Sequence, residues 1–222
     1  SLPAFSERKD FITIGNFLHA PNLDAVMYLK DTVWPLIREQ LPEVKLHIYG
    51  AYASQKVEQL HSEEDGFLVK GFAADVHAVM QNARVCIAPL RFGAGLKGKL
   101  IDALCNGTPF VTTSIGAEGL LNTSIVVDNV HDDPQHFADW AVSLYTSQSD
   151  WEASQNRGFK LINNRFNKVR FHKDFRIKLE ELKSDLTTHR QNNVVGQLLH
   201  HHTLQSTKYM AKWIEEKNKP NM

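Results

Sequence analysis

The stretch Pro89-Leu-Arg-Phe-Gly-Ala-Gly-Leu-Lys-Gly-Lys-Leu-Ile-Asp102 decides both the expected fold and the expected chemistry of this chain. An apolar, β-favouring run at residues 85–90 leads into the glycines, and a helical pattern follows. Gly93 and Gly95 let backbone amides approach an anion, and the start of the helix adds partial positive charge. Lys97 and Lys99 supply formal charge, while Asp102 can accept hydrogen bonds from sugar hydroxyls. The stretch predicts a site for a phosphorylated nucleotide.

The composition narrows the class of partner. The chain has 222 residues, with 25 basic and 25 acidic side chains, so no net charge favours nucleic acid or an anionic membrane as the main partner. No apolar run reaches the roughly 20 residues needed to span a bilayer, and no signal peptide is visible. We expect Cys86 and Cys105 to be reduced and to pack on apolar faces, which suits a cytoplasmic protein.

The chain up to about residue 150 alternates short apolar runs with amphipathic stretches, as in βα units on a parallel sheet. Strands are expected at 11–15, 45–49, 67–70, 85–89, 109–112 and 124–127, and helices at 22–40, 54–61, 75–81, 97–106 and 134–145. The fold class is therefore α/β: a Rossmann-like, doubly wound, mostly parallel six-stranded sheet with helices on both faces. Ligands of such sheets bind at the edge where the strands end.

Four residues punctuate these elements. Asp75 is expected to cap a helix start, Gly107 to follow a helix end, and Pro134 to lie in a first turn. Pro35 falls inside the first helix and should kink or divide it. Beyond residue 150 the pattern is helical, at 151–164, 169–186 and 194–217, which predicts a helical C-terminal extension.

The glycines of residues 93–98 also match the G-x-G-x-x-G pattern of dinucleotide-binding proteins, with Glu118 about 20 residues further on. The match is weak, because these glycines follow the fourth expected strand and not the first. A dinucleotide-dependent NAD(P) oxidoreductase domain remains one alternative. A non-enzymatic interaction module, whose helical tail recruits a partner, remains another.

Five motifs occur in order and at suitable spacing, at residues 22–26, 69–75, 88–99, 102–113 and 115–120. Together they resemble the C-terminal, donor-binding half of a GT-B glycosyltransferase of the group 1 or family 4 type, over about residues 10–147. The resemblance implies a linker remnant at 1–10, a Rossmann-like nucleotide-sugar-binding domain at 11–150 and a helical extension at 151–222.

The resemblance also implies roles for single residues. The diphosphate and donor would be held by Gly15, Asn16, Arg91, Gly93, Ala94, Gly95, Lys97 and Lys99. Asp102 and Glu118 would lie near the ribose or the sugar, and Lys70, Gly71 and Phe72 would border the nucleobase. The family carries two glutamates here, the first at the position of Ala94 and the second at that of Asp102. The alanine leaves the sugar preference open.

The expected function is that of the donor-binding half of an enzyme that transfers a hexosyl group from a nucleoside-diphosphate sugar to an acceptor. No metal, cofactor or confident catalytic residue is assigned, because the acceptor-side groups are expected on an N-terminal GT-B domain. That domain, of the same or a partner chain, and the nucleotide sugar are the expected partners. Peripheral membrane association through that domain is left open, and the chain by itself is expected to be inactive.

Overall fold

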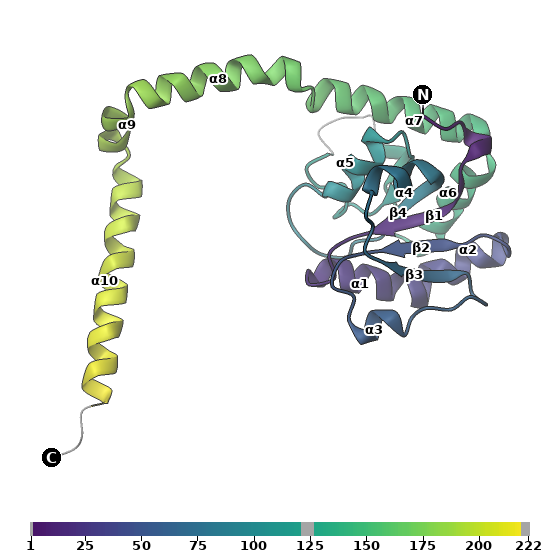
Figure 1. The fold of residues 1–222 in the computed structure, drawn as a ribbon, viewed down its shortest axis with the longest axis horizontal. Coiled ribbons are helices and arrows are strands. Elements are labelled where there is room, and N and C mark those ends of the chain that lie inside the picture. Colours follow the sequence, from purple (N-terminus) through teal and green to yellow (C-terminus); the bar gives the residue numbers. More distant parts are fainter. Residues whose placement is uncertain (1, 121–126, 219–222) are drawn as a thin grey trace. The chain divides into compact units, whose positions relative to one another are not determined.

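Five parallel strands form the sheet of the protein in the order β3-β2-β1-β4-β5 (Figure 1). The computed structural model describes residues 2–120 and 127–218. Its strands are β1 (Lys9–Ile14), β2 (Leu46–Tyr49), β3 (Phe67–Gly71), β4 (Ala83–Ala88) and β5 (Phe110–Thr112). The chain builds outward from β1 to β3 and then crosses back to β4 beside β1. The ends of β1 and β4 therefore flank the point where the strand order reverses, the usual ligand position in such sheets.

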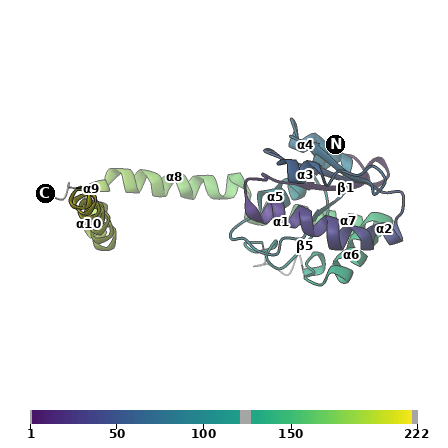
Figure 2. The same cartoon turned by 90° about the horizontal axis from the view of Figure 1, so that it is seen from below.

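Helices cover both faces of the sheet. One face carries α1 (Ala20–Tyr28), the π-helical η2 (Leu29–Val33), α2 (Trp34–Gln40) and α6 (Pro134–Thr146), and the other carries α4 (Val76–Asn82) and α5 (Gly98–Cys105). Figure 2 shows α4 on one side of the sheet and α2 and α6 on the other. Three shorter pieces are α3 (Gln55–Glu58), η1 (Phe5–Glu7) and η3 (Val127–Asn129), and α7 (Gln148–Arg165) packs on α5 and α6. The doubly wound architecture is confirmed.

The central strand β4 shows why the sheet is covered on both faces. Val85 and Ile87 belong to the apolar cluster under α1, α2 and α6, whereas Cys86 and Ala88 belong to the cluster under α4 and α5. Successive side chains of a strand point to opposite faces, so a continuous apolar run has to be buried twice. This burial fixes the strand end from which the glycine loop leaves.

Two expectations about the sheet and its helices differ from the structure. The sixth strand was expected at 124–127, but residues 124–126 lie outside the described part and Val127 begins η3. Val130 forms a single parallel bridge with Thr112 of β5, so the described sheet has five strands. Cys86 is buried as expected, but the expectation for Cys105 was wrong. Cys105 is the last residue of α5 and is exposed.

The helix punctuation is confirmed. The helix expected at 22–40 is interrupted by the π-helical turn η2, directly before Pro35. Asp75 caps α4, since its side chain accepts the amide of Ala78 at 3.0 Å. Gly107 follows the end of α5 with φ 62°, and Pro134 opens α6.

Arg8 fastens the segment before β1 to the domain. Its buried guanidinium donates to the carbonyl oxygen of Asn106 at 2.9 Å and to the hydroxyl of Thr108 at 2.8 Å, and lies over the Trp151 ring at 5.2 Å. Burial lowers the pKa of Arg8 to about 10. A buried cation needs such a set of acceptors to offset its lost hydration, so residues 3–8 are held against the ends of α4 and α5.

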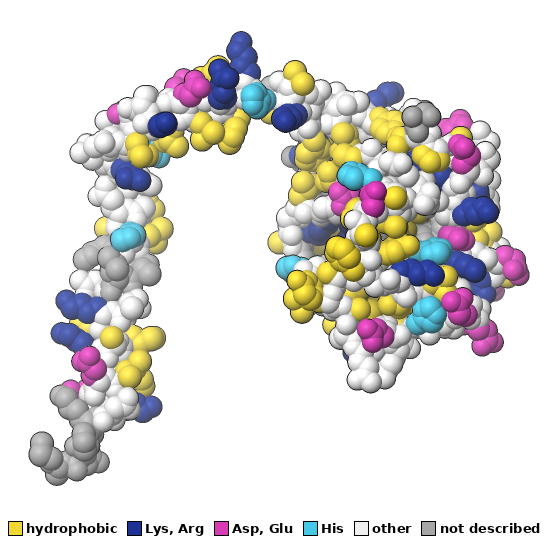
Figure 3. Space-filling model, in the orientation of Figure 1, with side chains coloured by type: hydrophobic (Ala, Val, Ile, Leu, Met, Phe, Trp, Pro, Cys, Tyr) yellow, Lys and Arg dark blue, Asp and Glu magenta, His cyan; other side chains and the backbone are white. Residues whose placement is uncertain are grey.

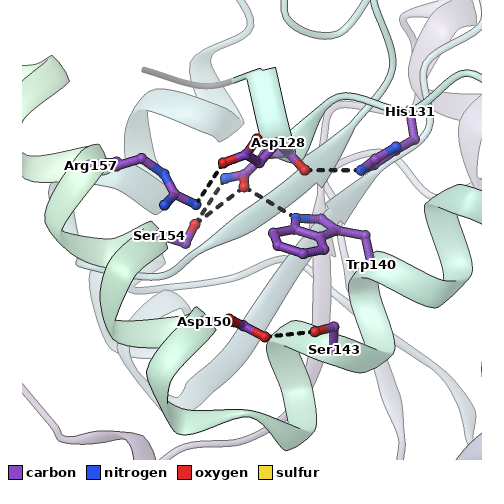
Figure 4. A network of polar contacts seen from close by, with 8 residues as sticks. Asp128, His131, Trp140, Ser143, Asp150, Ser154 and Arg157 are labelled. Carbon is purple, nitrogen blue, oxygen red and sulfur yellow. Dashed lines mark hydrogen bonds and ion pairs between the residues drawn. The ribbon is translucent and has the colours of Figure 1, made fainter. Parts of the chain in front are cut away.

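A polar network between α6 and α7 fixes η3 (Figure 4). The buried amide of Asn129 donates to the hydroxyl of Ser154 at 2.9 Å, and its oxygen accepts the indole N–H of Trp140 at 3.2 Å. Arg157 pairs with Asp128 at 3.6 Å. These contacts tie η3 to α6 and α7, and we assign them a structural role.

The chain divides into two compact units, Ser1–Phe166 and Asn167–Met222. The second unit contains α8 (Lys168–Ser184), α9 (Leu186–Asn192) and α10 (Val194–Lys217). Hydrophobic side chains lie exposed along α8 and α10 (Figure 3), among them Phe175, Leu179, Leu182, Leu198, Tyr209 and Trp213. No described helix is both long and apolar enough to cross a membrane. Compactness groups α7 with the first unit, and the functional boundary expected near residue 150 stays a prediction.

Candidate functional site

A cleft of about 730 Å³ opens where β1, β2, β3 and β4 end. Its wall is formed by the loops after these strands, the starts of α1 and α4, and the first turns of α5. Of the residues expected to hold a donor, eight line it: Gly15, Asn16, Phe72, Gly93, Ala94, Lys97, Lys99 and Asp102. The other five are not among the lining residues: Lys70 and Gly71 end β3, Arg91 and Gly95 lie in the loop after β4, and Glu118 lies after β5.

Lys99 is the cationic side chain that the cleft leaves without a compensating charge. Its ammonium donates to the amide oxygen of Asn22 at 2.8 Å, and within residues 2–120 and 127–218 no carboxylate pairs with it. Burial, with a smaller contribution from the positive charge of Lys97, lowers the pKa of Lys99 to about 8, while Cys86 acts in the opposite direction. A half-buried ammonium without a counter-ion is costly, so an anion in the cleft would stabilise it.

The start of α5 adds two backbone donors. Lys97 occupies the N-cap position and makes no side-chain cap, and the described chain offers no acceptor to the amides of Gly98 and Lys99 within hydrogen-bond distance. Both residues line the cleft. Unsatisfied amides at a helix start attract anions, because their dipoles add to that of the helix. The two residues that carry these amides line the same cleft as the Lys99 side chain.

Asp102 supplies an acceptor one turn further along α5. It lines the cleft, and no donor of the described chain hydrogen-bonds its carboxylate. Burial raises the pKa of Asp102, an effect that the nearby His77 partly offsets. A carboxylate that is partly desolvated and has open lone pairs can bind hydroxyl groups. The cleft therefore holds a cation and an acceptor side by side.

The glycine loop turns sharply beside α1. Gly93 has φ 122° and Gly95 has φ 76°, backbone conformations that side chains other than glycine rarely adopt. The carboxylate of Glu118 accepts the amide of Gly95 at 3.1 Å and lies 3.6 Å from the Lys97 ammonium, which itself donates to the Gly95 carbonyl at 2.7 Å. One amide and one lysine of the loop are thus already bound to an internal anion.

The loop after β1 faces the start of α5 across the cleft. The amide of Gly15 is used in the sheet, since it donates to the Tyr49 carbonyl at 3.0 Å. Asn16 turns the loop by accepting the Leu18 amide on its side chain at 2.9 Å, and its carbonyl accepts the amide of Asn22 at 2.9 Å. Gly15 and Asn16 line the cleft, and their contact with a diphosphate stays a prediction.

Arg91 is engaged elsewhere. Its guanidinium makes a two-point contact with Asp24 of α1, with Nε to Oδ2 at 2.9 Å, and lies over the ring of Tyr28 at 4.8 Å. The hydrogen bond and charge of Asp24 raise the pKa of Arg91. The arginine fastens the glycine loop to α1, and its contact with a donor stays a prediction.

The residues expected near a nucleobase follow β3. Phe72 lines the cleft with 74% of its side chain exposed. Gly71 turns the chain with φ 72° and accepts the amide of Gly50 at 2.8 Å, while Lys70 is exposed outside the lining. An exposed ring at the end of the cleft offers a flat apolar face, which is suited to stacking on a base.

Sequence analysis missed several residues of the cleft. Asn22 connects Lys99 to the loop after β1. In the sequence it was only part of one of the five motifs, and no role in the site was predicted for it. Apart from His19, the other lining residues missed are small or apolar: Ile14, Pro21, Gly50, Ala51, Ala73, Val76, Leu90, Leu96 and Gly98. The sequence could have predicted Asn22 as a cleft residue. A polar residue at the start of the helix after the first strand lies near the edge of the sheet where ligands bind. Among the described residues, no group of three or more His, Cys, Asp or Glu side chains is placed to hold a metal ion.

Comparison with known proteins assigns the family. The model of the family described as "Glycosyl transferases group 1" matches residues 8–147. The chain belongs to this family. A curated relative, an uncharacterised 44.6 kDa protein in the cps region of Klebsiella pneumoniae, is 29% identical over 113 residues, which are 48% of this chain and 29% of that protein.

Solved structures show the same GT-B fold. S. aureus TarM, solved in complex with Fondaparinux, alpha-GlcNAc-glycerol and UDP, matches with a TM-score of 0.63 and 14% identity over 79% of this chain and 36% of its own. The pneumococcal O-GlcNAc transferase GtfA, solved with UDP and GlcNAc, matches with a TM-score of 0.61 and 20% identity. The match covers 83% of this chain and 38% of GtfA. The catalytic domain of a Helicobacter pylori cholesterol-alpha-glucosyltransferase matches with a TM-score of 0.52 and 10% identity. The match covers 70% of this chain and 98% of that domain. The chain thus spans little more than a third of the first two proteins.

Proposed function

We propose that this chain is the donor-binding half of a glycosyltransferase, which binds a nucleoside-diphosphate sugar in the cleft and transfers its hexosyl group to an acceptor. The observation that carries the proposal is the Lys99 ammonium, which has no carboxylate partner in the described chain and shares the cleft with the open amides of α5. A diphosphate supplies the missing negative charge. Family membership supports the transfer reaction itself.

The remaining groups fit the other parts of such a donor. Asp102 can accept hydrogen bonds from ribose hydroxyls, and the exposed ring of Phe72 can stack on the base with Gly71 beside it. In two of the similar structures, UDP is named in the complex. Glu118 lies against Gly95, next to Ala94, where it remains available to a sugar. These residues together offer contacts for a base, a diphosphate and a sugar.

The chemistry follows from charge. In the transfer, the bond between the anomeric carbon and a diphosphate oxygen breaks, and the electron pair leaves with the diphosphate. A bond to the acceptor oxygen forms, and the acceptor loses its proton. Lys99 and the amides of Gly98 and Lys99 stabilise the departing diphosphate, because they are already oriented before the reaction. We infer that no metal is needed for this step.

The acceptor side is expected to come from a facing GT-B domain. The rim of the cleft exposes large apolar side chains from the loops after β1, β2, β3 and β4, with exposed fractions from 44% to 74%: Leu18, Tyr52, Phe72, Phe92 and Leu96. Such a rim is suited to being covered by another protein surface. The base that takes the acceptor proton would then lie on that surface.

The structure gives less support to a dinucleotide site. In proteins with the G-x-G-x-x-G fingerprint, the glycines connect the first strand to the first helix. Here β1 is followed by Gly15 and Asn16, and the glycine pattern connects β4 to α5. The apolar faces of α8 and α10 suit an interaction module, a role that is compatible with donor binding by the first unit.

The test is a thermal-shift panel of UDP, GDP, ADP and NAD against the folded chain, followed by amide chemical shifts. A ligand that binds the native state raises its apparent stability. We expect one nucleoside diphosphate to raise the melting temperature and to shift the amides of Gly98, Lys99 and Asp102. A response to NAD alone, or to none of the four at millimolar concentration, would contradict the proposal.

A further inference from the structure

The side chain of Asn22 connects three segments that form the cleft. Its amide oxygen accepts the Lys99 ammonium at 2.8 Å, and its amide nitrogen donates to the Asn16 carbonyl at 2.9 Å. Asn22 thereby links the third residue of α1 to the loop after β1 and to the second residue of α5. It is half-buried and lines the cleft beside the ammonium.

The Asn22 side chain has little freedom to move away. A Cβ atom added to Gly15 would lie 2.7 Å from the Asn22 side-chain carbon, so the amide already fills the space that a side chain at residue 15 would need. The Asn22 amide group is thus in contact with the backbone at Gly15 and with the ammonium of Lys99. The lysine is therefore held at one place by an acceptor that is itself fixed.

The acceptor of Lys99 differs from that of the other cations around the glycine loop. Arg91 is paired with Asp24, and Lys97 lies 3.6 Å from Glu118, whereas Lys99 meets a neutral amide. A carboxylate in place of the amide would neutralise the ammonium, as Asp24 and Glu118 do for their partners. The titratable groups that act on Lys99 are Cys86 and Lys97.

We propose that Asn22 is a positioning residue for diphosphate binding, which holds the Lys99 ammonium in the cleft by a neutral acceptor and so leaves its positive charge to the ligand. This role rests on the proposed function in taking the ligand to be a diphosphate. The proposal explains why the side chain at position 22 is an amide. The isosteric carboxylate would keep the hydrogen bond from Lys99 but would neutralise the positive charge of Lys99.

Two variants separate charge from geometry. Asn22→Ala and Asn22→Asp both lose the donor to the Asn16 carbonyl, but only Asn22→Asp adds a negative charge beside Lys99. Binding of inorganic pyrophosphate is measured by calorimetry at neutral pH, where the wild-type Lys99 is charged. We expect a loss of about 3-fold for Asn22→Ala and of about 30-fold or more for Asn22→Asp. Asn156→Asp, on the exposed surface of α7, controls for net charge and should bind like the wild type.

A second readout needs no ligand. The pKa of the Lys99 amine, followed by NMR of its terminal carbon and nitrogen, should rise by at least about one unit in Asn22→Asp above its value near 8. An asparagine that does not contact the ammonium in solution would leave this pKa unchanged on Asn22→Asp substitution, so the rise tests the contact on which the proposal rests. Pyrophosphate affinity of Asn22→Asp equal to or above that of Asn22→Ala, or an unchanged pKa, would overturn the role of Asn22. Failure of the wild type to bind pyrophosphate or any nucleoside diphosphate would instead overturn the proposed function.

Discussion

Lys97 and Lys99 stand two residues apart at the start of α5, yet their surroundings differ. The Lys97 ammonium folds back onto the Gly95 carbonyl at 2.7 Å, with the Glu118 carboxylate 3.6 Å away. The Lys99 ammonium lines the cleft, and its hydrogen-bond partner among the described residues is the neutral amide of Asn22. The sequence alone does not distinguish the two lysines. In the structure, the charge of Lys97 is balanced within the protein, whereas the charge of Lys99 remains available to a ligand.

The largest expected effect comes from deleting each charge in turn. We expect Lys99→Met to weaken pyrophosphate binding by roughly 10- to 100-fold, the usual worth of a hydrogen bond between charged groups. Lys97→Met should cost about 3-fold or less, because Glu118 already balances that lysine. Lys160→Met, on the exposed surface of α7, is the control. Calorimetry measures all three, and equal losses for Lys97→Met and Lys99→Met would break the comparison.

The pH dependence of anion binding should follow Lys99. Its pKa of about 8 means that the ammonium is present below this pH and lost above it, so affinity should be constant near neutrality and fall about 10-fold by one pH unit above 8. Sulfate is a suitable probe, because its own charge does not change in this range. Lys99→Arg keeps its charge and should bind equally well throughout, when amide shifts of Gly98 are followed by NMR. A wild-type curve as flat as that of the arginine variant would contradict this assignment.

A methyl group at Gly15 should disturb Lys99 through Asn22. The added carbon would lie 2.7 Å from the Asn22 side chain, so the amide has to shift. We expect Gly15→Ala to weaken pyrophosphate binding about 5-fold and to cost about 1–3 kcal/mol in the free energy of unfolding, measured in urea. Gly98→Ala is the contrast, since nothing lies within 4 Å of its added methyl and stability should be kept. Equal stability losses in the two variants would argue against this packing.

The smallest effect is expected from Glu118. Glu118→Gln removes the charge that balances Lys97 and keeps an oxygen for the Gly95 amide, so pyrophosphate should bind about 2- to 4-fold tighter. Glu43→Gln, at an exposed position outside the cleft, should have no effect. The same titration with a nucleotide sugar sharpens the comparison. Weaker binding of the sugar nucleotide alone would show that Glu118 contacts the sugar, as the resemblance to the family implies.

The sheet and its helices were predictable because their signals are local. The apolar runs of the five strands, the cap at Asp75 and the first-turn proline Pro134 each depend on a few neighbouring residues. The exposure of Cys105 was not predictable, since the pattern of α5 does not tell how much of the helix its neighbours cover. The same holds for Arg91, whose partner Asp24 lies 67 residues earlier in the chain.

The sequence by itself determined that a glycine loop with two lysines leaves a buried strand and starts a helix, because strand burial, glycine turns and helix starts are written in consecutive residues. Only the tertiary structure decided what each charged group meets. Asn22 and Lys99 are 77 positions apart and Gly95 and Glu118 are 23 apart, and folding brings each pair together. The residue type fixes the charge of a side chain. Whether that charge is available to a ligand depends on which partners the packing of the chain brings next to it.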